Sequence, residues 1–133
     1  MGHSYTCYFS GHDCPFYTKE GVGILESPNY PGNYPLGVEC RWRVRPGHTR
    51  RVLIIVSHLS LAPDCTDIFT IRRSDHPKTG IVFKTCSSRN QPLVITGHSK
   101  NLWVHFSSSG ESSASGFQMT VLSVEGKEED FFK

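Results

Sequence analysis

The chain has 133 residues, of which 37% are hydrophobic, enough for a single domain with a buried core. Its formal net charge of +2 argues against a nucleic-acid partner, because nucleic-acid-binding domains usually carry a stronger basic excess. The longest apolar run, residues 52–56, is far shorter than the ~20 residues that a membrane-spanning helix needs, so we expect no direct membrane insertion.

Short stretches of alternating apolar and polar residues, separated by turn residues, follow one another along the chain and predict strands. Residues 28–35 include three prolines, which exclude a regular ladder and predict an extended, turning segment. In residues 40–45 the apolar side chains of Trp42 and Val44 fall on one face of a strand, and the arginines fall on the other face. We therefore expect Trp42 in the core.

The remaining strands follow at regular intervals. Residues 51–57 are nearly all apolar and predict a central strand with both faces covered. Further strands are expected at 68–72, 80–84, 93–96, 101–106 and 116–124. Residues 107–115 are rich in serine and predict a flexible loop. Together these elements predict an all-β fold, a two-sheet antiparallel β-sandwich.

Five widely spaced cysteines indicate the compartment in which the chain folds: Cys7, Cys14, Cys40, Cys65 and Cys86. They lack the Cys-x-x-Cys spacing of zinc sites, and disulfides formed in an oxidising, extracellular compartment explain them better. Two bridges and one leftover cysteine are expected, and the spacing alone leaves every pairing open.

Several of these motifs occur together in one known family. Cys14, the proline-tyrosine segment 23–35 and Cys40-Arg41-Trp42 resemble the opening of a CUB domain. Cys65-Thr66-Asp67, Cys86, residues 101–106 and residues 115–118 match its later part. The chain is most similar to the CUB domain of the SCUBE (signal peptide–CUB–EGF-like) family of secreted proteins.

The resemblance implies a CUB-like jelly roll with the pairing Cys14–Cys40 and Cys65–Cys86, each bridge contributing roughly 3 kcal/mol by restricting the unfolded chain. Cys7 is then unpaired, either as the leftover of a preceding disulfide-rich module or as the site of an intermolecular bridge. We expect the CUB domain at residues 14–124. Residues 1–13 are then an N-terminal extension or the remnant of a preceding module, and residues 125–133 a charged tail or linker.

The resemblance also implies a calcium site built from a tyrosine, a glutamate and two aspartates, the hard oxygen ligands that calcium prefers. In this chain the four positions fall at Tyr34, Ala62, Asp67 and Ser109. Two of the three carboxylates are therefore missing, so we expect a degenerate site without metal. We expect no cofactor either.

Two features are candidates for binding a partner. The first is a basic strand face with the side chains of Arg41, Arg43 and Arg45, near which Arg50, Arg51, Arg72 and Arg73 are expected. It suits an acidic protein surface or heparan sulfate, or it is simply a solvated face that discourages aggregation.

The second candidate is an exposed apolar cluster in the proline-rich segment, formed by Tyr30 and Tyr34 with Pro31 and Pro35. It is expected either to contribute to a binding rim or to pack on the edge of the sandwich. Trp103 lies on the alternate face of its strand, where it acts either as a binding anchor or as a second-sheet contact.

No catalytic residues are expected, because the sequence has no nucleophile elbow and a small filled sandwich seldom has a pocket. The seven histidines show no spacing that brings them together on a metal. The sequence thus predicts a non-catalytic, extracellular protein–protein interaction module of a larger secreted or membrane-tethered protein. The resemblance to the SCUBE family implies growth factors, morphogens or receptors as partners, and the alternative is a heparan sulfate-binding module that uses the arginine face.

Overall fold

The structure, a computed structural model, describes residues 5–8, 14–20, 22–44, 50–74, 76, 78–98, 102–109 and 111–125. These residues form ten strands: β1 (Tyr5–Tyr8), β2 (Phe16–Lys19), β3 (Val22–Glu26), β4 (Glu39–Val44), β5 (Arg50–Ser60), β6 (Ile68–Arg72), β7 (Ile81–Thr85), β8 (Leu93–His98), β9 (Leu102–Ser107) and β10 (Gly116–Glu125). Within the described ranges there is no helix with the length and apolar character that a membrane crossing needs.

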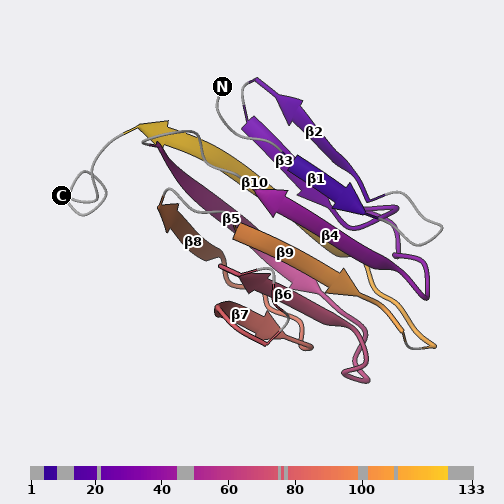
Figure 1. The fold of residues 1–133 in the computed structure, drawn as a ribbon. Coiled ribbons are helices and arrows are strands. Elements are labelled where there is room, and N and C mark those ends of the chain that lie inside the picture. Colours follow the sequence, from indigo (N-terminus) through magenta and orange to yellow (C-terminus); the bar gives the residue numbers. More distant parts are fainter. Residues whose placement is uncertain are drawn as a thin grey trace.

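The strands form two five-stranded sheets that stack as two layers (Figure 1). The β4 sheet has the strand order β1-β4-β9-β6-β7, and the β5 sheet has the order β2-β3-β10-β5-β8. All the strand pairs are antiparallel. The predicted two-sheet antiparallel sandwich is therefore confirmed.

Alternation along the strands places one face of each sheet in a common core. In β9, Leu102, Val104 and Phe106 are buried, whereas the intervening side chains are only half-buried. Trp42 is fully buried, as predicted.

The ring of Phe117 from β10 packs edge-to-face against aromatic rings of the opposite sheet, from Trp42, Phe69 and Phe106. Each such pair adds roughly 0.5–1.5 kcal/mol to the burial of the rings. This aromatic cluster thus joins the two sheets at the centre of the core.

Two disulfides join distant segments of the chain, and their pairing is the predicted one. Cys14–Cys40 ties the segment before β2 to β4, with a Cα–Cα distance of 5.7 Å. Cys65–Cys86 ties the β5–β6 connection to the residue after β7, with a Cα–Cα distance of 4.8 Å. Cys7 belongs to β1, but its side chain lies outside the described part of the structure, and its unpaired state stays a prediction.

Three features of the fold differ from the sequence-based expectations. The edge strands β1 and β2 were not predicted, and β1, within the expected N-terminal extension, pairs with β4. The prediction that residues 51–57 are covered on both faces is wrong. One face of β5 is buried, but Leu53 and Ile55 on the other face are only half-buried, because no described element packs over the outer side of this sheet.

Two glycines with positive φ provide a matched test of how closely the start of β10 packs against Ser27. Gly116 (φ +81°) begins β10 against Ser27, whose hydroxyl would overlap a Cβ at residue 116. Gly37 (φ +73°) faces open space. We expect Gly37→Ala to cost about 1–2 kcal/mol from backbone strain alone, and Gly116→Ala to cost about 1–3 kcal/mol more through overpacking.

Chemical denaturation of the two variants measures this difference. Equal losses of unfolding free energy would contradict the close Ser27–Gly116 approach.

Candidate functional site

Tyr34 lies at the centre of one end of the sandwich, where three connections meet. Its side chain is only 1% exposed. The hydroxyl donates a hydrogen bond to Asp67 Oδ2 at 2.5 Å and accepts one from the Ala62 amide at 2.9 Å. Burial, and then the Asp67 carboxylate, raise the pKa of the Tyr34 hydroxyl.

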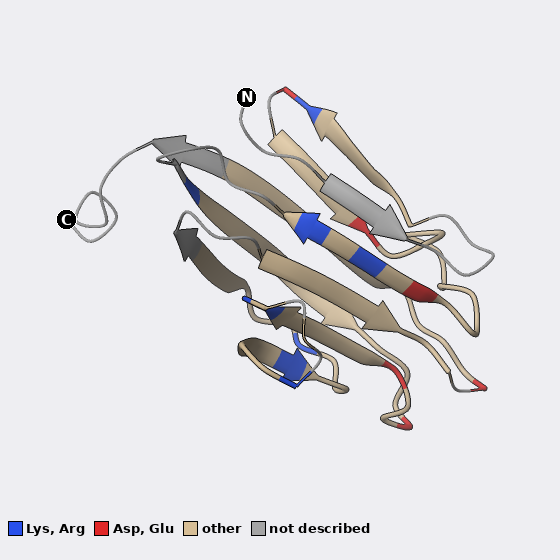
Figure 2. Ribbon diagram, in the orientation of Figure 1, with Lys and Arg blue, Asp and Glu red and all other residues tan. Residues whose placement is uncertain are grey.

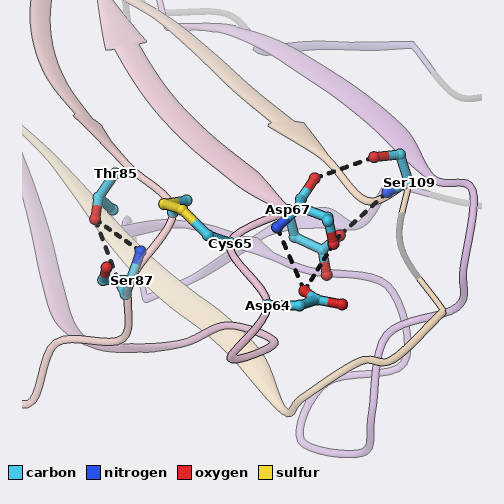
Figure 3. Close-up of a disulfide and its surroundings, with 8 residues drawn as sticks. Asp64, Cys65, Asp67, Thr85, Ser87 and Ser109 are labelled. Carbon is cyan, nitrogen blue, oxygen red and sulfur yellow. Dashed lines mark hydrogen bonds between the residues drawn. A yellow bond between two sulfur atoms is a disulfide. The ribbon is translucent and has the colours of Figure 1, made fainter.

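The serine-rich loop between β9 and β10 hydrogen-bonds to Asp67 and to the residue before it (Figure 3). The Ser109 amide donates to Asp67 Oδ1 at 3.1 Å, and the Ser109 hydroxyl donates to the Thr66 carbonyl at 3.0 Å. The structure therefore brings together Tyr34, Ala62, Asp67 and Ser109, the four positions that the resemblance implies for a calcium site.

The residues present at this end do not fit a calcium ion. Ala62 offers no side-chain oxygen, and both Asp67 oxygens already accept hydrogen bonds within the protein. Asp64 accepts hydrogen bonds from the Thr66 hydroxyl and the Ser112 hydroxyl, so its carboxylate is also engaged. Calcium takes 6–8 oxygen ligands with enough negative charge to dehydrate it, and this donor set lacks both.

The proline-rich segment is exposed on one side only. Pro31 is exposed and Tyr30 is half-buried, while the nearby Leu36 is 48% exposed. The prediction that Tyr34 belongs to an exposed, partner-binding cluster is wrong, because its ring packs against Phe106 and its hydroxyl serves the buried network. The apolar residues of this segment that remain accessible to a partner are Tyr30, Pro31 and Leu36, which we call the apolar rim.

The outer face of the β4 sheet is cationic. Figure 2 shows Lys and Arg bands on β4 and at the end of β6, on either side of the uncharged β9. Arg41 and Arg43 point away from the buried Trp42 and Val44, as predicted. Arg45 lies outside the described residues. Arg51 belongs to the β5 sheet, so the expectation that it extends the same basic face is wrong.

Strand pairing arranges this face in cross-strand rows. Arg43, Trp103 and Arg72 form one row across β4, β9 and β6. Arg41, His105 and Thr70 form the next. The guanidinium carbon of Arg43 lies 5.7 Å from the centroid of the Trp103 ring, within range of a cation–π contact.

Glu39 partly neutralises the row that contains His105. Its Oε1 accepts a hydrogen bond from Arg41 and lies 3.6 Å from His105 Nε2. Burial, followed by the Arg41 guanidinium, holds the pKa of His105 below its usual value, with Arg72 acting in the same direction and Glu39 against it.

Sequence reasoning missed the roles of Glu39 and His105 and the position of Arg72 beside Trp103. The alternation in residues 68–72 and 101–106 gives the outward positions of these strands. It does not reveal that β9 lies between β4 and β6, and this strand order puts the arginines on either side of Trp103.

The raised pKa of Tyr34 predicts a stability loss in alkali. Above the usual tyrosine pKa of about 10 the unfolded chain loses this proton while the folded chain keeps it, so the free energy of unfolding falls as pH rises. We expect Tyr34→Phe to be less stable near neutral pH, because the Ala62 amide and Asp67 each lose a partner. It should also show a shallower loss above pH of about 10.

Denaturant unfolding at several pH values measures both effects, with Tyr30→Phe as the control. An unchanged alkaline slope in Tyr34→Phe would contradict the assignment.

The chain matches the family model for the CUB domain over residues 14–121. It is 38% identical over 108 residues to mouse signal peptide, CUB and EGF-like domain-containing protein 3, covering 80% of this chain and 11% of that protein. It is 36% identical over 118 residues to human cubilin, covering 85% of this chain and 3% of that protein. The chain thus spans only a small part of the relatives that it matches.

Two solved structures share the fold. The extracellular region of zebrafish Gpr126/Adgrg6 aligns with a TM-score of 0.67 and 23% identity, covering 80% of this chain and 14% of that one. The CUB1-EGF-CUB2 domain of human MASP-1/3 aligns with a TM-score of 0.66 and 18% identity, covering 86% and 46%. The matching family model, the sandwich and the disulfide pairing agree, and the chain belongs to the CUB domain family.

Proposed function

We propose that this extracellular CUB domain is a non-catalytic protein-binding module and that it binds its partners without calcium. One observation carries the calcium-independent part. Asp67 is buried and accepts hydrogen bonds from Tyr34 and Ser109, so protein groups occupy the oxygens that a metal would need. The loops at this end are then held by hydrogen bonds formed on folding.

Two surfaces support recognition of a protein. The rim of Tyr30, Pro31 and Leu36 presents apolar side chains on a hydrogen-bonded scaffold. The cationic face combines arginines with a half-buried tryptophan, and Arg and Trp are enriched among the residues that dominate protein interfaces. By family resemblance, the partner class is growth factors, morphogens or receptors.

Heparan sulfate is the second candidate ligand, and the arginine rows favour it. Against it, Arg41 is already paired with Glu39, and Arg43 lies against the Trp103 ring rather than standing free in solvent. Polyanionic glycans need a strongly basic, accessible surface, whereas the whole chain has a net charge of only +2. A protein partner therefore agrees better with this surface.

The absence of calcium dependence can be tested by thermal unfolding in EDTA and in millimolar calcium. We expect the same Tm in both for the natural sequence. In the double variant Ala62→Glu with Ser109→Asp, which restores the two missing carboxylates, we expect calcium to raise Tm by several degrees, since a ligand that binds only the folded state stabilises it. A calcium-dependent Tm in the natural sequence would refute the proposal.

Ligand capture tests the protein-binding function itself. The immobilised chain, exposed to a library of extracellular proteins, should retain the same proteins in EDTA and in calcium. Retention on heparin should end near physiological salt. Capture of no protein, together with heparin binding that persists well above physiological salt and is lost when Arg41, Arg43 and Arg45 are changed to serine, would favour the heparan sulfate function instead.

A further inference from the structure

Arg72 is a buried charge that the described part of the fold leaves without an acidic partner. It lies at the end of β6 and is only 8% exposed. Its Nε donates a hydrogen bond to the Ser74 carbonyl at 3.2 Å. Among the described residues no carboxylate lies within ion-pair distance of it. Burying a cation without an anion is costly, so a buried arginine in a structural role is normally paired with an acid.

Arg72 shares its row with a second incompletely satisfied arginine. Arg72 and Arg43 are both register partners of Trp103, from the strands on its two sides. Arg43 Nε is buried and has no hydrogen-bond partner within the described ranges of the chain. Neighbouring strands are about 4.8 Å apart, which places the two arginine backbones about 10 Å from each other with the indole between them. Two arginines whose guanidinium groups keep spare donors among the described residues therefore lie in the strands on either side of Trp103, and the Arg43 guanidinium contacts its ring.

Glu39, the acidic side chain that the described part of β4 places on this face, is paired with another arginine. Glu39 lies in the row with Ser107 and Ile68, where it pairs with Arg41 and approaches His105. It thus matches the charge of Arg41, and among the residues that the structure describes no acid matches the charges of Arg43 and Arg72. The excess of positive charge on this face is concentrated in the row that contains Trp103.

We propose that the Arg43–Trp103–Arg72 row anchors a carboxylate side chain, an Asp or Glu presented by an acidic segment of a partner protein. The proposal rests on the protein-binding function inferred above and specifies which chemical group of the partner is bound. A carboxylate matches the planar fork of a guanidinium and accepts two parallel hydrogen bonds from it. The Trp103 ring provides the apolar contact that excludes water from such a pair.

The positions of the two arginines favour a protein side chain over a sulfated glycan. Arg72 is buried and Arg43 is half-buried, so a ligand must reach between side chains rather than lie across the top of them. A single Asp or Glu side chain can do this. A chain of sulfated sugars would in addition approach the carboxylate of Glu39, which is exposed beside Arg41.

The test uses the full chain and two synthetic peptides, one of alternating Gly and Glu and one of alternating Gly and Gln. We expect the Glu peptide, and not the Gln peptide, to shift the NMR resonance of the Trp103 indole N–H. Arg43→Gln and Arg72→Gln should each weaken this binding by roughly tenfold or more, since each removes one partner of the charge pair. Arg89→Gln, the same change in the β7–β8 connection, should leave it unaltered.

Thermal unfolding provides a readout that does not depend on the peptide. If Arg72 is kept for binding, Arg72→Met should keep or raise Tm, because it removes an unmatched buried charge. A large drop in Tm for Arg72→Met with unchanged peptide binding would make Arg72 a structural residue and overturn the proposal.

Two further outcomes would also overturn it. One is equal binding of the Glu and Gln peptides. The other is a heparin-derived oligosaccharide that shifts the Trp103 resonance while the Glu peptide does not. If proteins captured from the extracellular library bind the Arg43→Gln and Arg72→Gln variants as well as the natural sequence, this anchor fails while the protein-binding function stands. If no protein is captured at all, the protein-binding function itself fails.

Discussion

The hydrogen bond between the Tyr34 hydroxyl and the buried Asp67 carboxylate determines how one end of the sandwich is built. A buried carboxylate is tolerated only when its oxygens are satisfied, and here the partners come from two loops distant in sequence. The Tyr34 amide also donates to the Ala114 carbonyl, and Ser108 bonds to Val38 and Pro35. Three connections thus form one hydrogen-bonded unit, and the placement of the apolar rim depends on it.

Because hydroxyl and amide donors of the protein satisfy Asp67, its carboxylate is not free to hold a metal ion that a partner could contact. A calcium site would need several carboxylates at this end of the molecule. Here Ala62 and Ser109 stand at two of those positions. The outer face of the β4 sheet instead carries Arg41, Arg43 and Arg72 in neighbouring strand rows. This arrangement of charge is the basis on which we propose an acidic partner.

Local pattern was enough to predict most of the strands, the buried Trp42 and the outward Arg41 and Arg43. Family resemblance supplied the disulfide pairing, which spacing alone left open. Alternation cannot reveal which strands become neighbours, so the placement of Arg72 beside Trp103 and of Arg51 in the other sheet required the structure. Tyr34 was wrongly predicted to be exposed, because a tyrosine between prolines gives the same sequence pattern whether its ring points outward or into a buried network.

Arg72 has no acidic partner in the described structure, and this is compatible with a stable fold because the disulfides and the aromatic core supply the stability. Two disulfides contribute roughly 3 kcal/mol each, and the edge-to-face cluster around Phe117 joins the sheets without using the outer face. Because these interactions stabilise the fold, the domain tolerates a buried charge that lowers its free energy of unfolding. Binding of a partner would offset this penalty, since strain and unpaired charge are commonly retained where binding needs them. The partner's carboxylate would then gain a charge-assisted bond and relieve a penalty already present in the free domain. The affinity of such a site therefore depends on how completely Arg72 is left unpaired in the absence of the partner.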